Sequence, residues 1–187
     1  MTLPRDEIVR GMQRDGFQLA SDIGKEKVLE ESSGFILIGH LRCELVYPDG
    51  TRIQKDLGRN RVVDNGLLCA AHVLSGDATY ANYRITQFAI GYSAGATESN
   101  STTALAGQLY STAPTVTHGS TGVASYEISV GKDQAYPGAG NTATINEAGL
   151  LATNASPALV TYKVYTPQDV SDSFTLILRW TLTHARV

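Results

Sequence analysis

The chain has 187 residues, of which 18% are charged and 42% are hydrophobic, and this is enough for one domain of ordinary size with a hydrophobic core. This composition excludes a disordered chain and a collagen-like repeat. The 15 basic and 18 acidic side chains leave a formal net charge of -3. Because no overall positive field is available to hold a phosphate backbone, we expect no nucleic-acid partner.

The N-terminal residues include no apolar stretch of the signal-peptide type, and the longest hydrophobic run, Phe35–Leu41, is interrupted by Gly39 and His40. We therefore expect neither secretion by that route nor a membrane partner. The two cysteines, Cys43 and Cys69, are far apart and have no clustered histidine. This spacing predicts two small buried side chains rather than a zinc site or a disulfide framework.

Charge divides the chain into two parts, because 20 of the 33 charged residues fall within residues 1–62. Residues 1–34 contain glycines at short intervals and few apolar side chains, so we expect an N-terminal arm followed by a domain over residues 35–187. Thr2 and Pro4 favour one short helix in the arm, with Ile8, Val9 and Met12 on one face. Two interpretations stay open, namely a floppy terminus and an arm that becomes ordered on a neighbouring subunit.

The first part of the domain predicts a hairpin and a helix. Residues 35–47 are rich in strand-forming side chains, and Tyr47-Pro48-Asp49-Gly50 has the chemistry of a type I turn that closes a hairpin with a bulge. The return strand is expected over Thr51–Leu57. Asp64 or Asn65 then caps a helix over Gly66–Leu74.

The second part predicts strands joined by turns, with apolar side chains at alternate positions. In Thr86–Tyr92, the side chains Phe88, Ile90 and Tyr92 are expected to point the same way. The alternation is clearest from Phe174 to Thr183, where the even-numbered residues are apolar and Trp180 is expected in the core. Further strands are expected over Ala124–Val130, Thr144–Leu151 and Leu159–Tyr165, with turns at Pro157, at Pro167 and over Pro137–Asn141.

The segment Ser93–Gly122 contains 12 serines and threonines and a single charged residue, Glu98. It is interpreted either as a long surface loop or as an excursion around a short helix near Thr103–Leu109. With several strands and little helix, the fold class is predicted as mainly β, an antiparallel two-layer β-sandwich or jelly-roll-like domain with one or two short helices.

One segment matches a catalytic motif. Gly91-Tyr92-Ser93-Ala94-Gly95 has the letters of a nucleophile elbow after a predicted strand, and Asp169 or Asp172 and then His184 follow in the order that hydrolases use. The residues after Gly95 are a poor helix start, and the alternation of strands and helices typical of a parallel sheet is missing. We therefore predict a glycine-flanked turn and assign no catalytic residue.

The remaining polar candidates do not form recognisable sites either. His40, His72, His118 and His184 have no partner at metal-ligand spacing, so no metal is expected, and no phosphate-binding glycine pattern or other cofactor motif occurs. Tyr80, Tyr83 and Arg84 are the only local cluster that could stack on single-stranded nucleic acid, and we interpret them as surface or interface residues.

Glu147 is an isolated acid in the otherwise uncharged segment Ile145–Leu151. Such a carboxyl group can be a catalyst with a raised pKa. Because an unpaired buried charge is costly, we favour a carboxylate that accepts backbone hydrogen bonds or pairs with an arginine such as Arg84 or Arg179.

Five segments in a fixed order resemble a group of virion proteins of tailed bacteriophages. The likeness extends over about Gly34 to Thr183, and one departure is the longer gap between the glycines after Ala89. The segments are Asn60–Gly66, Ile85–Thr97, Ser101–Gly107, Ile145–Leu151 and Ser171–Thr183.

The resemblance implies a non-enzymatic structural protein of the virion, assembled in the host cytoplasm. The expected role is a capsid decoration or cement subunit that binds the particle surface as a homo-oligomer, with the major capsid protein or tail proteins as partners. A tail, baseplate or fibre-anchor component is the alternative. A third possibility is a carbohydrate-binding or hydrolytic sandwich that uses Trp180, the tyrosines of residues 80–92 or Ser93.

Overall fold

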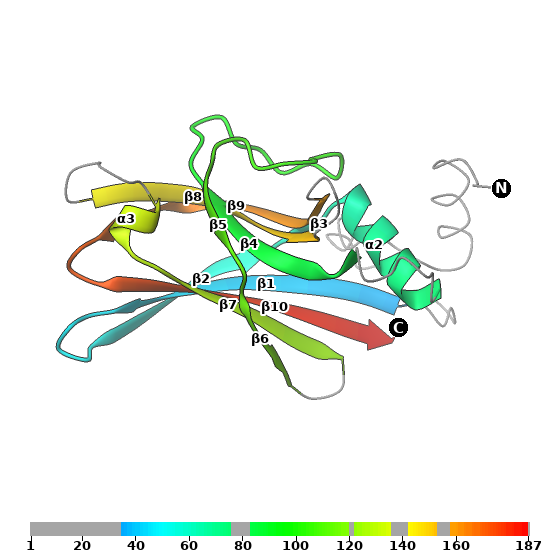
Figure 1. Ribbon diagram of the computed structural model, residues 1–187, viewed down its shortest axis with the longest axis horizontal. Helices are drawn as coiled ribbons and strands as arrows, with labels where there is room; N and C mark the ends of the chain where they lie inside the picture. The colour runs from blue at the N-terminus through cyan, green and yellow to red at the C-terminus, as the bar shows by residue number, and fades with distance from the viewer. Residues whose placement is uncertain (1–34, 76–82, 120–121, 136–141, 153–157, 187) are drawn as a thin grey trace.

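The computed structural model describes residues 35–75, 83–119, 122–135, 142–152 and 158–186. Within these ranges the chain forms two antiparallel sheets of five strands each, stacked face to face, with two short helices (Figure 1). The predicted mainly β, two-layer architecture is therefore confirmed. The predicted arm, Tyr80, Pro157 and the Pro137–Asn141 turn lie outside the described residues.

Sheet A has the strand order β2-β1-β10-β7-β6, and sheet B has the order β3-β9-β8-β4-β5. Figure 1 shows sheet A as the lower layer and sheet B as the upper one. The strands are β1 (Phe35–Val46), β2 (Arg52–Arg59), β3 (Arg61–Val62), β4 (Ile85–Gly91), β5 (Gln108–Thr112), β6 (Thr115–His118), β7 (Val123–Val130), β8 (Thr142–Ala152), β9 (Ala158–Ser171) and β10 (Thr175–Arg186). The helices are α2 (Asp64–Ser75) and α3 (Lys132–Ala135).

The main core lies between the two sheets. Trp180 of β10 is fully buried and meets the ring of Phe88 from β4 edge-on, with ring centroids 5.7 Å apart. Leu176, Leu178 and Leu182 are buried on the same face of β10, as their even-numbered positions predicted. This core fixes the distance between the layers and places the outer faces of the sheets on opposite sides of the molecule.

The first hairpin forms as the turn chemistry predicted. Tyr47 N–H donates to Thr51 C=O over 2.9 Å, and Gly50 N–H donates to Tyr47 C=O over 3.0 Å. The return strand β2 extends to Arg59, two residues beyond the predicted end. The chain then passes from sheet A to sheet B at Asn60, between β2 and β3.

Helix α2 packs closely against β9. A Cβ atom on Gly66 would lie only 2.1 Å from the carbonyl oxygen of Val160, so a residue without a side chain is needed where the helix meets the strand. Cys69, one turn further along, is buried against Ala152 and Val160. Both cysteines are buried and free, as predicted. No helix in the described ranges is long and apolar enough to span a membrane.

The prediction for Ser93–Gly122 was wrong in part, since this segment contains the two strands β5 and β6 and, among its described residues, no helix over Thr103–Leu109. Serine and threonine clusters are common in loops, but the β-branched threonines also suit strands. The prediction for Tyr92 was also wrong. Strand β4 ends at Gly91 after a register shift, and the Tyr92 side chain is 44% exposed.

Pro167 does not mark a turn, in contrast to the prediction, but lies inside the 14-residue strand β9. The pairing between β8 and β9 changes register between Ile145 and Glu147, which pair with Gln168 and Val164. The extra residues on β9 form a bulge that includes Pro167. A bulge accommodates proline because its missing N–H leaves no ladder bond unmade.

Candidate interaction surface

The outer face of sheet A is not covered by any described element, and we call it the open face. Its side chains are mostly polar and exposed or half-buried. Their positions follow from the strand pairing, because directly opposed residues point to the same side of a sheet. The central part consists of His40, Arg42, Ser125, Glu127, Arg179 and Thr181.

Charges on the open face are arranged in one row across the strands. Glu127, Arg179, Arg42 and Asp56 are consecutive partners on β7, β10, β1 and β2. Arg179 donates from Nε and Nη2 to Glu127 Oε2 over 2.8 and 2.5 Å. At the other end of the row, His40 Nε2 lies 2.6 Å from Asp56 Oδ1. Opposite charges therefore compensate each other along the row, and the hydroxyl groups of Ser125 and Thr181 lie beside it.

The outer face of sheet B is covered by residues 92–107, which we call the cover segment and which runs above sheet B in Figure 1. Leu105 of this segment is 7% exposed and packs in a cluster with Ala89, Leu151, Leu159 and Tyr162. Helix α2 covers the adjoining part of the sheet. The part of β8 from Ile145 to Ala152, in the middle of sheet B, is therefore buried on both faces.

Polar contacts fix the cover segment to the strands below it. Glu98 accepts hydrogen bonds from Lys163 Nζ and from the backbone N–H of Val164. Asn146 binds the backbone of Ser93 twice, as an acceptor over 3.0 Å and as a donor over 2.8 Å. These contacts join residues more than 50 positions apart, so the cover segment is a structural layer and not a loose loop.

Glu147 provides the most deeply buried anchor. Its side chain is fully buried and accepts hydrogen bonds from Ala106 N–H at 3.0 Å, Gly107 N–H at 2.6 Å and the Tyr162 hydroxyl at 2.5 Å. Burial, followed by the Glu147 carboxylate, raises the pKa of Tyr162, so its hydroxyl keeps the proton that it donates. A Cβ atom on Gly107 would lie 2.0 Å from the Tyr92 carbonyl oxygen, so glycine allows this close approach.

The prediction that Glu147 accepts backbone hydrogen bonds is therefore confirmed. The suggested partner Arg179 instead pairs with Glu127. Both of these residues lie on sheet A, whereas Glu147 lies on sheet B. Glu147 has no exposed surface, and its carboxylate oxygens are used to hold the cover segment.

The structure does not bring the residues of the hydrolase-like motif together. Ser93 lies in a turn of the cover segment over sheet B, where its backbone binds Asn146. Asp169 accepts a hydrogen bond from Thr144, and Asp172 accepts one from Lys132. His184 lies on β10 of sheet A. The glycine-flanked turn predicted for residues 91–95 agrees with this arrangement.

The four histidines also lie apart from one another. His40 is on β1, His118 is on β6 and His184 is on β10, while His72 of α2 stacks on the ring of Tyr83 with centroids 4.0 Å apart. Among the described residues, no group of three or more histidine, cysteine or acidic side chains is arranged to hold a metal ion.

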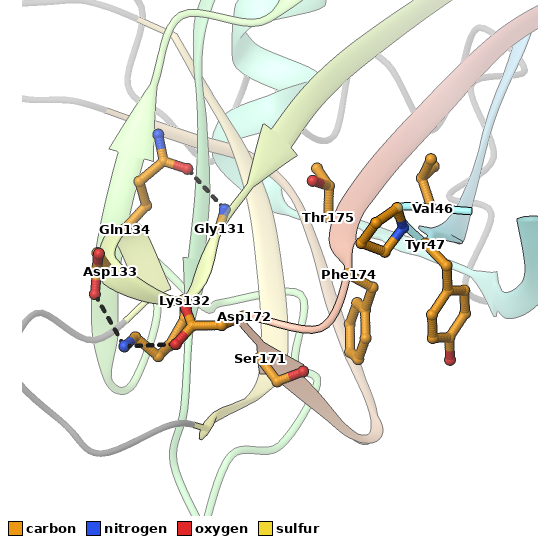
Figure 2. Close-up of a pocket in the computed structure, with 11 residues that line it drawn as sticks. Val46, Tyr47, Gly131, Lys132, Asp133, Gln134, Ser171, Asp172, Phe174 and Thr175 are labelled. Atoms are coloured by element: carbon orange, nitrogen blue, oxygen red, sulfur yellow. Dashed lines mark hydrogen bonds and ion pairs between the residues drawn. The ribbon is translucent and has the colours of Figure 1, made fainter. Parts of the chain in front are cut away.

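Sequence reasoning missed a pocket at one end of the sandwich, which we call the end pocket (Figure 2). Three segments that are distant in sequence, namely the β1–β2 turn, the start of α3 and the β9–β10 turn, form this hollow of about 490 Å³. Figure 2 shows the rings of Tyr47 and Phe174 side by side, with centroids 5.5 Å apart. Across the pocket, Lys132 Nζ lies 3.1 Å from Asp172 and 3.4 Å from Asp133. The only available signal was the predicted turn at Tyr47–Gly50.

Electrostatics hold Lys132 of the end pocket in its charged form. Its hydrogen bond to Asp172, together with the nearby Asp133, raises the pKa of the lysine. The lysine side chain is 14% exposed, whereas those of Asp133 and Asp172 are 81% and 64% exposed. The pocket therefore presents aromatic carbon on one side and accessible carboxylates on the other.

Comparison with known proteins found no matching family model, no matching curated protein and no matching solved structure.

Proposed function

We propose that the chain is a non-enzymatic structural protein of a bacteriophage virion, a capsid decoration or cement subunit that binds the particle as an oligomer. The resemblance of five ordered segments, from Asn60–Gly66 to Ser171–Thr183, supports the virion assignment. A tail, baseplate or fibre-anchor position is the alternative within the same virion.

The observation that carries the proposal is the difference between the two outer faces. Sheet B is covered by the chain itself, through the cover segment and α2. The open face of sheet A carries hydroxyl groups and a row of compensated charges. A surface with these properties suits polar docking on a partner, and many weak contacts on a symmetric shell add up to firm attachment.

A binding experiment with matched variants tests the docking surface. Thr181→Arg places a bulky charge in the middle of the open face, and Thr103→Arg places the same charge on the exposed surface of the cover segment. Both proteins are added to particles that were assembled without this chain, and the bound fraction is measured by sedimentation. We expect at least tenfold weaker binding for Thr181→Arg and unchanged binding for Thr103→Arg. Equal binding of both variants would contradict the docking role of the open face.

Copy number separates the two positions in the virion. A decoration subunit is present in proportion to the shell protein, whereas a tail or fibre-anchor component is present in a few copies per particle. Quantitative gel analysis of purified virions distinguishes these outcomes.

Deletion of residues 1–34 tests the arm, and we expect a folded sandwich that no longer binds particles. Full retention of binding would remove the arm from the mechanism.

The end pocket favours a second candidate function, the binding of a saccharide. Sugars stack their apolar C–H faces on aromatic rings and hydrogen-bond their hydroxyl groups to carboxylates, and the end pocket offers Tyr47 and Phe174 together with Asp133 and Asp172. Trp180, the aromatic residue considered for this role from the sequence, is fully buried in the core.

A glycan array with Phe174→Ala and the exposed control Tyr92→Ala tests this function. Glycan binding by the wild type that Phe174→Ala abolishes and Tyr92→Ala retains would support it, whereas no binding by the wild type would remove it.

A further inference from the structure

The two sides of the sandwich differ in how their edge strands are protected. On one side the edges are β2 of sheet A and β3 of sheet B, and on the other side they are β6 of sheet A and β5 of sheet B. An edge strand exposes unpaired backbone N–H and C=O groups, and proteins usually protect such edges with charge, shortness or bulges.

The β2–β3 side carries these protective features. Strand β2 contains four charged residues, namely Arg52, Lys55, Asp56 and Arg59, and its pairing with β1 is interrupted by a register shift between Leu41 and Arg42. Strand β3 has only two residues. A further strand would meet charge and irregular geometry on this side.

The β5–β6 side has much less protection. The stretch Gln108–His118 contains no acidic side chain, no lysine and no arginine, and Pro114 lies between its two strands rather than within either of them. All four residues of β6 are exposed, and Val116 is 41% exposed. Thr115, Val116 and Thr117 are β-branched residues, which suit a paired strand.

The backbone direction of β6 follows from its hairpin with β7. Gly119 N–H donates to Val123 C=O, and the ladder continues through Thr117 opposite Ser125 and Thr115 opposite Glu127. Since backbone groups alternate along an antiparallel pair, Val116 and His118 direct their N–H and C=O groups away from β7. Two donors and two acceptors therefore point outward from β6, the last strand of sheet A among the described residues.

We propose that the β6 edge pairs with the β6 edge of a second copy of this chain, antiparallel and centred on Thr117. In this register, Val116 and His118 of one copy bind His118 and Val116 of the other through four backbone hydrogen bonds. The edge is thus complementary to itself, and it contains no acidic side chain, lysine or arginine that would repel a second copy. The two sheets A join into one continuous sheet of ten strands.

The symmetry of this pairing gives it a consequence for docking. The twofold axis of an antiparallel strand pair runs perpendicular to the sheet, so the open faces of both copies lie on the same side. The dimer presents a docking surface of twice the width. This consequence rests on the proposed function, whereas the pairing itself does not.

The oligomeric state of the full-length chain tests the pairing. Val116→Lys places a charge on the β6 edge, and Ile53→Lys places the same charge on β2, where Ile53 is 42% exposed. Val116→Pro removes one outward N–H without removing a bond to β7. Light scattering coupled to size-exclusion chromatography is expected to show a dimer for the wild type and for Ile53→Lys, and a monomer for both Val116 variants. Circular dichroism checks that each variant is folded.

Hydrogen exchange then locates the contact. The amides of Val116 and His118 are expected to exchange slowly in the concentrated wild-type protein and rapidly in Val116→Lys. A monomeric wild type, or a dimer that survives both Val116 substitutions, would overturn the proposal. Protection of these amides in a monomer that is lost after deletion of residues 1–34 would also overturn it, because the occupant of the edge would then be the arm. A wild type that is dimeric through β6 but does not bind particles would refute only the proposed function.

Discussion

Sheet A and sheet B share an apolar interface but differ on their outer faces, and strands β10 and β8 illustrate the difference. In β10, Leu176, Leu178, Trp180 and Leu182 are buried while their neighbours are exposed or half-buried. In β8, every side chain from Ile145 to Ala152 is buried. A strand with one exposed face alternates in polarity, whereas a strand that is buried on both faces reads as a continuous run. The chain therefore covers sheet B itself, whereas none of the described segments covers the outer face of sheet A.

The largest expected difference concerns two glutamates, one on each sheet. Glu147→Ala removes a buried carboxylate and leaves the Tyr162 hydroxyl and two backbone N–H groups without their acceptor, so we expect a loss of about 4 kcal/mol in the free energy of unfolding. Glu127→Ala removes an exposed partner of Arg179 and is expected to cost less than about 1 kcal/mol. Urea unfolding measures both values. Similar losses for the two variants would show that the cover segment is not held by Glu147.

The apolar contact of the cover segment gives the next largest effect. Leu105→Ala leaves a cavity between the cover segment and sheet B and is expected to cost about 3 kcal/mol. Ile53→Ala on β2, where the side chain is 42% exposed, is expected to cost less than about 1 kcal/mol. If both substitutions have equally small effects, the outer face of sheet B is not sealed by Leu105.

Two glycines provide a sharper test of how closely the covering elements approach sheet B. Gly66→Ala forces a Cβ atom against the Val160 carbonyl, and we expect a loss of about 2 kcal/mol as α2 moves off β9. A Cβ atom on Gly95 would meet nothing within 4 Å, so Gly95→Ala is expected to change stability by less than about 1 kcal/mol. Thermal unfolding compares the two variants. A Gly66→Ala protein as stable as the wild type would mean that the helix can shift at no cost.

The smallest effect concerns the pH dependence of sheet A. The backbone N–H of Gly58, followed by the His40 side chain, lowers the pKa of Asp56 below its usual value of 3.8. A carboxyl group with a lowered pKa in the folded state stabilises the protein above the unfolded pKa, and this contribution is lost as the pH falls through the folded value. We therefore expect Asp56→Asn to be slightly less stable than the wild type at pH 6, with the difference disappearing below pH 3.8. Unfolding curves at pH 6 and at a pH below 3.8 measure this difference in stability. A difference that grows on acidification would contradict the lowered pKa of Asp56.

The fold could be predicted from the sequence wherever the signal is local. The alternation in β10, the turn at Tyr47–Gly50 and the cap at the start of α2 each depend on residues that are close in sequence. The two-layer class follows from such local signals.

The parts that were missed depend on contacts between distant segments. The sequence marked Glu147 as unusual, but its backbone donors come from residues 106 and 107, about 40 positions earlier. The end pocket combines two turns and the start of α3, which come from separate parts of the chain. Strand β6 was overlooked because serine and threonine are common in loops, and its strand character depends on pairing with β7.

A density map of the intact particle that separates the two sheets tests the central claim most directly. We predict that strands β1, β10 and β7 of sheet A face the shell, while the cover segment over sheet B faces solvent. A map with the cover segment against the shell and the open face in solvent would contradict this account.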